Sequence, residues 1–365
     1  MRWLSDGSVD RLREEADLPD LGGSKYLVLH KLGWGGMGTV YLAQDVDLGR
    51  KVAVKVMNMA DPTGALATRM MREARIVALL EHPSIVPIHD VGALDDGRVF
   101  YAMKLVQGKR LDQTTGDNAS FYDLLRIFQK VCEAVAFAHA RGVIHRDLKP
   151  ENIMVGPFGE VLVMDWGVAK VLSDADLAAD PAPTDEHSEL HAIEDADLIA
   201  TLPLVAGKTG DTSGGTVIGT PAYMSPEQAR GQTELLDERS DVFSLGAILY
   251  YLLTGRPPYE SDGGTVARRQ TWKSPIRPRQ LDRKIPRQVE AICLKAMSEH
   301  REDRYATAEG VGVDVVKFLD GNPVSAYREN VFEKAFRWLN KNRFIVILIL
   351  AYLIMRLIVF FAVGR

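Results

Sequence analysis

The chain has 365 residues, of which 46% are apolar and 25% charged, and a formal net charge of −5. This length and composition are typical of a globular protein with two or three domains, or of one bilobed fold with appendages. The charge gives no sign of the basic patch that nucleic-acid binding requires, so we expect no nucleic-acid partner. Residues 1–24 are polar, lack the apolar stretch of a signal peptide and are predicted to form an adaptable N-terminal arm.

The next eighty residues are predicted to form a β-rich unit with one helix. The helical pattern spans Ala65–Leu80, with Ile76, Leu79 and Leu80 on its apolar face. The strands are predicted from short β-type runs between glycine turns, at Leu27–Leu32, Val40–Ala43, Val52–Val56 and Phe100–Val106.

Four glycines lie in the turn between the first two strands: Gly33, Gly35, Gly36 and Gly38. Glycine lets the backbone approach phosphate groups closely and present N–H groups to them. The alternative is an ordinary hairpin. A strand rather than a helix follows, which argues against a dinucleotide-binding turn.

Lys55 closes an apolar strand seventeen residues after Gly38. A lysine in this place needs an anionic partner, which triphosphate oxygens and Glu73 on the predicted helix would supply. The alternative is a strand-end lysine that points to solvent.

The chain then becomes helical. Ser120 and Asp123 are predicted to cap a helix over Phe121–Ala140, in which Leu124, Phe128, Val131 and Val135 recur on one side. Cys132 in this helix and Cys293 in a later apolar run are expected as small core residues. With no disulfide framework and no zinc spacing, they fit a reducing cytosol.

An ordered polar set follows this helix: Asp147, Lys149, Asn152 and Asp165. Phosphoryl transfer needs a carboxylate to accept a hydroxyl proton, a cation for the γ-phosphate and two metal ligands, and this set provides them within some twenty residues. Beyond it, residues 173–213 hold ten acidic residues against Lys208 alone, with three prolines. Such a segment is predicted to be largely mobile, and for residues 173–200 a spacer without a role is an equal alternative.

On these motifs, Tyr26 to Leu319 resembles a eukaryotic-like serine/threonine protein kinase of the bacterial membrane-anchored kind. The resemblance implies an α+β, bilobed protein kinase fold that uses ATP and Mg²⁺. The β-rich N-lobe would span residues 25–104 and the larger helical C-lobe residues 105–320, with the acidic insert 173–213 as an extended activation loop.

The resemblance also implies roles. Asp147 would be the catalytic base, Lys149 would meet the γ-phosphate, Glu73 would position Lys55, and Asn152 and Asp165 would ligate Mg²⁺. Met103 would be the gatekeeper and the backbone from Lys104 to Val106 the hinge. The implied ATP-binding residues are Leu32, Gly33, Gly35, Gly36, Gly38, Val40, Ala53, Lys55, Met103, Lys104, Val106 and Met154.

Three positions depart from the family pattern. Trp166 replaces phenylalanine in the metal-binding turn and should still pack, Lys104 replaces an acidic hinge residue, and Ser225 replaces alanine before Pro226 and Glu227. Among the structural residues that the resemblance implies, Glu227 would pair with Arg304 in a buried ion pair, and Asp241 would support the catalytic loop.

Lys149 and Thr220 match the serine/threonine branch of the family rather than the tyrosine branch. Arg146, next to the base, implies control by phosphorylation of the activation loop. The candidate sites are Thr209, Thr212, Ser213 and Thr216, of which Thr212 and Thr216 are favoured. The alternative is that these hydroxyl groups only form turns in a glycine-rich loop. Autophosphorylation between two copies would make a homodimer a partner beside protein substrates.

Phe344–Val363 is apolar for twenty residues except Arg356, long enough for one transmembrane helix. Residues 321–343 form a basic juxtamembrane segment with Lys334, Arg337, Lys341 and Arg343, so the positive-inside rule predicts a single-pass protein of the cell inner membrane with a cytoplasmic kinase domain. The alternative is a buried apolar helix. Arg356 would snorkel to the interface or pair with an acidic residue on a partner helix.

Two other functions remain open. A pseudokinase scaffold would keep the fold without chemistry, but such proteins usually lack the strand lysine, the catalytic aspartate or the metal aspartate, and all three are present. A membrane sensor with a kinase output would receive its signal through the membrane, the N-terminal arm or dimerisation, because only two residues follow the apolar segment.

Overall fold

The structure is a computed structural model that describes residues 18–34, 38–58, 65–94, 96–114, 119–166, 169–171, 221–259 and 275–363. Most of the N-terminal arm and the whole acidic insert 173–213 lie outside these residues. So do Gly35, Gly36 and the candidate phosphorylation sites, and these predictions therefore remain untested.

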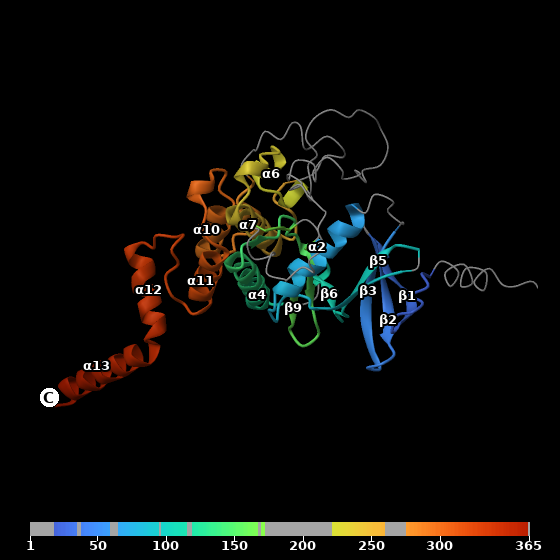
Figure 1. The fold of residues 1–365 in the computed structure, drawn as a ribbon. Coiled ribbons are helices and arrows are strands. Elements are labelled where there is room, and N and C mark those ends of the chain that lie inside the picture. Colours follow the sequence, from blue (N-terminus) through green and yellow to red (C-terminus); the bar gives the residue numbers. More distant parts are fainter. Residues whose placement is uncertain are drawn as a thin grey trace, which may run out of the picture.

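The N-lobe is a five-stranded antiparallel sheet with the strand order β1-β2-β3-β5-β4. It lies at one side of the molecule, with the helical lobe at the other (Figure 1). Helix α2 (Ala65–Leu79) packs on the sheet. The strands are β1 (Tyr26–Trp34), β2 (Gly38–Asp45), β3 (Arg50–Met57), β4 (Ile88–Ala93) and β5 (Val99–Lys104).

The two faces of this sheet carry separate hydrophobic clusters. One face packs Tyr26, Val54 and Phe100 together with Leu21, so residues 18–24 are part of the lobe rather than of a loose arm. The other face packs Met57, Tyr101 and Met103 against α2. Because side chains alternate across a strand, Lys55 lies on the same face as Met57, towards α2.

Most predicted N-lobe elements are present, with shifted ends. Phe100–Val106 was too long, because the β3–β5 ladder ends at the pair Val52–Lys104. Gly108 shows how closely the chain then passes strand β8 (Ile153–Val155), since a Cβ there would lie 2.2 Å from the carbonyl oxygen of Val155. Strand β4 was missed. Its sequence Ile-His-Asp-Val-Gly-Ala has no apolar alternation, because it is a half-exposed edge strand.

The predicted apolar face of α2 was right for Ile76 and Leu80 and wrong for Leu79, which is 46% exposed. The buried side of the helix includes Met70 and Ala74. At 100° per residue, Leu79 points away from that side although it is only three residues from Ile76.

The C-lobe is built around α7 (Glu238–Thr254), whose residues from Ser240 to Tyr250 are all buried. Helix α4 begins and ends as predicted, and Ser120 and Asp123 form its capping box. Cys132 and Cys293 are buried in the core, as predicted. The other C-lobe helices are α3 (Leu111–Thr114), α4 (Phe121–Ala140), α6 (Pro226–Ala229), α9 (Pro278–Leu281), α10 (Arg287–Ala296) and α11 (Ala308–Leu319).

Short strands line the side of the C-lobe next to the sheet. They form one group with the order β6-β8-β9 and a pair β10-β7. Their bounds are β6 (Lys109–Arg110), β7 (Val143–Ile144), β8 (Ile153–Val155), β9 (Val161–Val163) and β10 (Lys170–Val171). Single 3₁₀ turns cover Pro150–Asn152, Pro221–Tyr223, Thr233–Leu235 and Arg301–Asp303.

Two helices follow the C-lobe, α12 (Val331–Lys341) and α13 (Arg343–Val363), and α13 points away from the rest of the molecule (Figure 1). Val324 is buried in the C-lobe core, so the packing of this lobe extends past residue 320. A helix over Phe344–Val363 is present, but the transmembrane prediction is not confirmed. In the part of the chain that the structure describes, no helix has the length and apolar character of a membrane span.

Candidate active site

Lys55 and Glu73 form an ion pair between β3 and α2. The Nζ of Lys55 donates to both carboxylate oxygens of Glu73, at 2.9 and 3.1 Å. The same amine lies 3.8 Å from Oδ1 of Asp165, which comes from the other lobe. Burial by itself would lower the pKa of Lys55. The electrostatic effects of Tyr101 and Glu73 outweigh burial, so the pKa of Lys55 lies above its ordinary value. Lys55 is therefore a permanent cation between two carboxylates.

Three predicted residues meet in the catalytic loop. Lys149 Nζ donates to Oδ2 of Asp147 at 2.6 Å, and the side-chain amide of Asn152 donates to the carbonyl oxygen of Asp147 at 2.9 Å. The amide also lies 3.3 Å from Oδ2 of Asp147. These bonds hold the Asp147 carboxylate beside a cation and leave the Asn152 side-chain oxygen for another ligand.

Asp241, on α7, fixes the backbone of this loop at His145 and Arg146. Its two oxygens accept the backbone N–H groups of His145 and Arg146 at 2.8 and 2.9 Å. Burial would raise the pKa of Asp241, but the hydrogen bond and charge of His139 hold it below its ordinary value. Arg146 has a φ of 70°, a strained conformation for a residue with a side chain, and the bonds to Asp241 stabilise it.

Asp165 is tied to the catalytic loop through its neighbours in sequence. The backbone N–H of Met164 donates to the carbonyl oxygen of Asn152 at 2.8 Å. Trp166 is fully buried, and its ring lies 4.5 Å from that of His145, so the large aromatic packs as predicted. Asp165 itself has a φ of 59°. The two predicted metal ligands thus sit on adjoining backbone segments.

Four of the implied ATP-binding residues belong to the hydrophobic cluster on the α2 side of the sheet, namely Val40, Ala53, Met103 and Val106. Ala53 and Met103 are buried neighbours in the β3–β5 ladder, and Val40 is the register partner of Lys55. Gly38 has no room for a side chain, because a Cβ would lie 2.6 Å from the carbonyl oxygen of Val56. Leu32 and the Lys104 side chain are exposed, Val106 and Met154 are half-buried, and Gly33 has open space around it.

The chemistry of these residues fits a nucleotide with a divalent ion. Mg²⁺ prefers a few carboxylate and amide oxygens together with phosphate oxygens, which Asp165 and Asn152 can supply. Lys55 and Lys149 add cations for phosphate groups. Among the described residues, no group of three or more His, Cys, Asp and Glu side chains is arranged to hold a metal ion.

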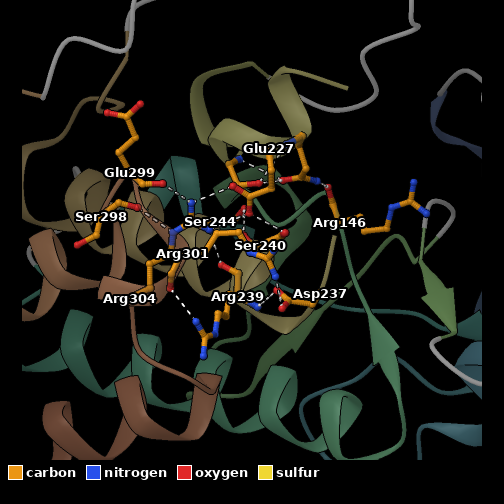
Figure 2. Close-up of polar contacts among 12 residues, drawn as sticks. Arg146, Glu227, Asp237, Arg239, Ser240, Ser244, Ser298, Glu299, Arg301 and Arg304 are labelled. Carbon is orange, nitrogen blue, oxygen red and sulfur yellow. Dashed lines mark hydrogen bonds and ion pairs between the residues drawn. The ribbon is translucent and has the colours of Figure 1, made fainter. Parts of the chain in front are cut away.

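A second polar cluster contacts the catalytic loop at Arg146 (Figure 2). Arg304 donates two parallel bonds to Glu227, at 2.8 and 2.9 Å, and Ser240 donates to the same carboxylate at 2.8 Å. Burial would raise the pKa of Glu227, but Arg304 holds it below its ordinary value. The ion pair expected from the sequence is present. It joins α6 to α7 and to the 3₁₀ turn before α11.

Sequence reasoning missed three supporting residues. Tyr101 donates to Glu73 at 2.8 Å, His139 binds Asp241, and Gln228 donates to the carbonyl oxygen of Arg146 at 2.7 Å. Tyr101 could have been found, because strand alternation places it on the same face as Met103. Ser225 and Gln228 match the capping-box pattern that begins a helix, but nothing local indicates the bond to Arg146.

Comparisons with known proteins agree with this geometry. A family model of the protein kinase domain matches residues 26–187 and 205–314. Serine/threonine-protein kinase PknD of Protochlamydia amoebophila is 34% identical over 320 residues, which cover 81% of this chain and 30% of that protein. Serine/threonine-protein kinase PknB of Mycobacterium leprae is 36% identical over 304 residues, which cover 81% of this chain and 43% of that protein. The chain thus spans less than half the length of these relatives.

Solved structures show the same fold. The PknI kinase domain of Mycobacterium tuberculosis superimposes with a TM-score of 0.57 at 22% identity, and the match covers 83% of this chain and all of that one. A second structure of that domain gives a TM-score of 0.54. The two-lobed fold, the polar set between the lobes and the match of the family model lead to one conclusion: the chain belongs to the protein kinase family.

Proposed function

We propose that the chain is a serine/threonine protein kinase that transfers the γ-phosphoryl group of ATP to hydroxyl groups of proteins. The observation that carries the proposal is the convergence of two polar sets from different lobes. Lys55 and Glu73 come from the sheet and its helix, and Asp147, Lys149 and Asn152 come from the catalytic loop. Asp165 lies within 3.8 Å of Lys55 and joins the two sets.

Each residue then has a defined task. Bound ATP would supply the phosphoryl group, and the Mg²⁺ bound with it would neutralise charge on the phosphate oxygens. Lys55, held by Glu73, orients the phosphates, and Asp165 and Asn152 hold the ion. Asp147 orients the substrate hydroxyl and accepts its proton, and Lys149 beside it offsets negative charge at the reacting phosphate.

Incubation with labelled ATP, Mg²⁺ and a general protein acceptor separates this function from that of a pseudokinase. The parent chain should label Ser or Thr. Asp147→Asn keeps the size of the side chain but removes the base and should be silent. A parent chain that binds ATP but labels nothing above the level of this variant would establish the scaffold instead.

We also propose that the kinase phosphorylates its own activation segment, on Thr212 or Thr216. Arg146 next to the base supports the proposal, because the guanidinium group of an arginine can bind a phosphate through two charge-assisted hydrogen bonds. Mass spectrometry after ATP–Mg²⁺ treatment should find phosphate there in the parent and not in Lys55→Met. A rate that rises with the square of enzyme concentration would indicate transfer between two copies, and an unmodified segment in an active enzyme would refute the proposal.

A third proposal is that α13 anchors the kinase in the cell inner membrane, as a single-pass protein with its catalytic lobes in the cytoplasm. Nine large apolar side chains between Phe344 and Met355 are at least half exposed, which is unusual for a surface in water. On α12, Val331, Phe332, Trp338 and Leu339 are exposed as well, whereas Glu333 and Arg337 bind Tyr327 and Glu329. The polar side of α12 thus binds the segment that leads from the C-lobe into this helix, and its apolar side is available to the bilayer.

Alkaline carbonate extraction of membranes tests the anchor. The full chain should stay in the membrane pellet, and the double variant Ile349→Arg, Leu353→Arg should move to the supernatant. Equal release of both proteins would contradict the anchor and would leave the kinase proposal untouched.

A further inference from the structure

The carboxylate of Glu73 has a second donor besides Lys55. The hydroxyl of Tyr101, on β5, donates to Oε1 of Glu73 at 2.8 Å, and both side chains are buried. Oε1 therefore accepts from Tyr101 and from Lys55 at the same time. Tyr101 and Lys55 are also direct cross-strand partners in the β3–β5 ladder, so the phenol and the amine reach Glu73 from neighbouring strands.

The two donors differ in how many partners they must serve: Lys55 has several and Tyr101 has one. In the proposed reaction Lys55 must also bind phosphate oxygens, and it already lies 3.8 Å from Asp165. The Tyr101 hydroxyl donates only one hydrogen bond, and its acceptor here is Glu73. Phosphate binding therefore does not compete for this donor, and the ring is carried by β5, an interior strand of the sheet.

The electrostatics keep Tyr101 a donor. Burial raises the pKa of the phenol, Lys55 opposes this effect, and Glu73 adds to it, so the net shift is upward. The hydroxyl thus stays protonated at physiological pH. The ring has a role as well, since its centroid lies 5.5 Å from Lys55 Nζ, within the range of a cation–π contact.

We propose that Tyr101 is a positioning residue for the phosphate-binding lysine. It keeps Glu73 directed at Lys55 before ATP arrives, so that the binding-competent arrangement is already populated. The inference rests on the proposed kinase function. It differs from a structural role, in which the hydroxyl would only satisfy a buried carboxylate and its loss would change stability but not nucleotide affinity.

Tyr101→Phe tests the proposal, because it keeps the ring and removes only the hydroxyl. A lost hydrogen bond to a charged group reduces the competent fraction, so the Kd of a non-hydrolysable ATP analogue with Mg²⁺ and the KM for ATP should both rise about tenfold. The kcat should stay within about twofold, because at saturation the bound nucleotide selects the competent state.

The chain offers a matched control. Tyr26 lies in the same sheet, and its hydroxyl donates to the carboxylate of Asp90 at 3.1 Å, away from Lys55. Tyr26→Phe removes the same kind of bond and should leave both constants unchanged. Equal constants for Tyr101→Phe and the parent, or an equal rise in both variants, would overturn the proposal.

A double-mutant cycle covers the case in which Tyr101→Phe folds poorly. In a Glu73→Gln background the further change of Tyr101→Phe should raise the analogue Kd much less than it does in the parent. Additive effects would show that Tyr101 acts independently of Glu73 and would also overturn the proposal. A parent chain that does not bind the analogue at all would instead refute the proposed function.

Discussion

The Asp241 carboxylate lies beneath the catalytic loop and has two oxygens with separate tasks. Oδ1 accepts from the backbone of Arg146, and Oδ2 from the backbone of His145 and from His139. Asp241→Asn replaces one oxygen by an NH₂ group that faces a donor, so the loop must shift. A displacement of about 1 Å at a catalytic group can reduce the rate by about 100-fold, so kcat should fall by this factor while the KM for ATP changes little.

Steady-state kinetics and thermal melting check this prediction together. Asp314→Asn is the control, because Asp314 is equally buried in the C-lobe and is bonded to Tyr305 and Ser325 away from the loop. Both variants should melt at lower temperature, but only Asp241→Asn should lose kcat. An unchanged kcat in a folded Asp241→Asn protein would show that the loop does not need this support.

Trp166 combines good packing with an unsatisfied group. It is fully buried, yet its indole N–H has no hydrogen-bond partner among the described residues. An orphaned donor costs about 1–3 kcal/mol, and the extra ring area of tryptophan offsets about the same amount. Trp166→Phe should therefore change the free energy of unfolding by less than about 1 kcal/mol, whereas Trp166→Ala should cost about 3–5 kcal/mol. Urea unfolding measures both, and similar costs for the two variants would contradict the account.

At the scale of whole elements, the sequence predicted features with local patterns well, but it did not predict contacts between residues far apart in the chain. Helix α4 was predicted to the residue, because its capping box and apolar repeat are local features. Strand β4 was missed, because half-exposed edge strands lack the alternation that prediction needs. Lys55 and Glu73 followed from motif spacing. The bond from Gln228 to Arg146 did not, because 82 residues separate the two and no pattern reports such a contact.

The Glu227–Arg304 pair joins α6 to the rest of the C-lobe and should matter far more than a surface pair. Both side chains are almost fully buried, so removal of one partner leaves an uncompensated charge. Arg304→Met should therefore cost about 3–5 kcal/mol of unfolding free energy. The adjacent pair Arg230–Glu299 approaches to the same distance of 2.8 Å, but its side chains are 47% and 50% exposed.

This neighbouring pair supplies the control for urea unfolding. Arg230→Met should cost at most about 1 kcal/mol, because solvent screens an exposed pair. If Arg304→Met is as mild as Arg230→Met, α6 does not depend on the buried pair. If Glu227→Gln restores part of the stability of Arg304→Met, the cost came from the charge left alone rather than from lost packing.

In the molecule as a whole, the lobes are joined near the C-terminal end of α2. Arg141 donates to the carbonyl oxygen of Leu79 at 2.6 Å, and Val163 on β9 donates to that of Ser84 at 2.8 Å. Ile85 is buried in the C-lobe core, although it follows an N-lobe helix. The end of α2 that follows Glu73 is thus attached to the C-lobe, while Lys55 and Tyr101 hold the middle of the helix to the sheet.

Buried carboxylates make the stability of the C-lobe depend on pH. The pKa values of Glu227, Asp241 and Asp314 all lie below their ordinary values of 4.5, 3.8 and 3.8, because hydrogen bonds and cations outweigh burial. The unfolded chain therefore binds protons first as the pH falls. These groups contribute their full stability above the unfolded values, and the contribution is lost as the pH falls from about 5 through the lowered values.

Thermal melting between pH 7 and pH 3 should accordingly show its steepest loss of stability below about pH 5. Asp314→Asn removes one of the three groups without touching the catalytic loop, so its melting temperature should be lower at pH 7 and should fall less between pH 5 and pH 3.5 than that of the parent. Parallel curves for the two proteins would mean that Asp314 has the same proton affinity in the folded and the unfolded chain.

Because all three carboxylates lie in the C-lobe, acid should weaken this lobe and with it the support of Asp147 and Asn152. Kinase activity should therefore be lost in the same pH range as the melting temperature falls.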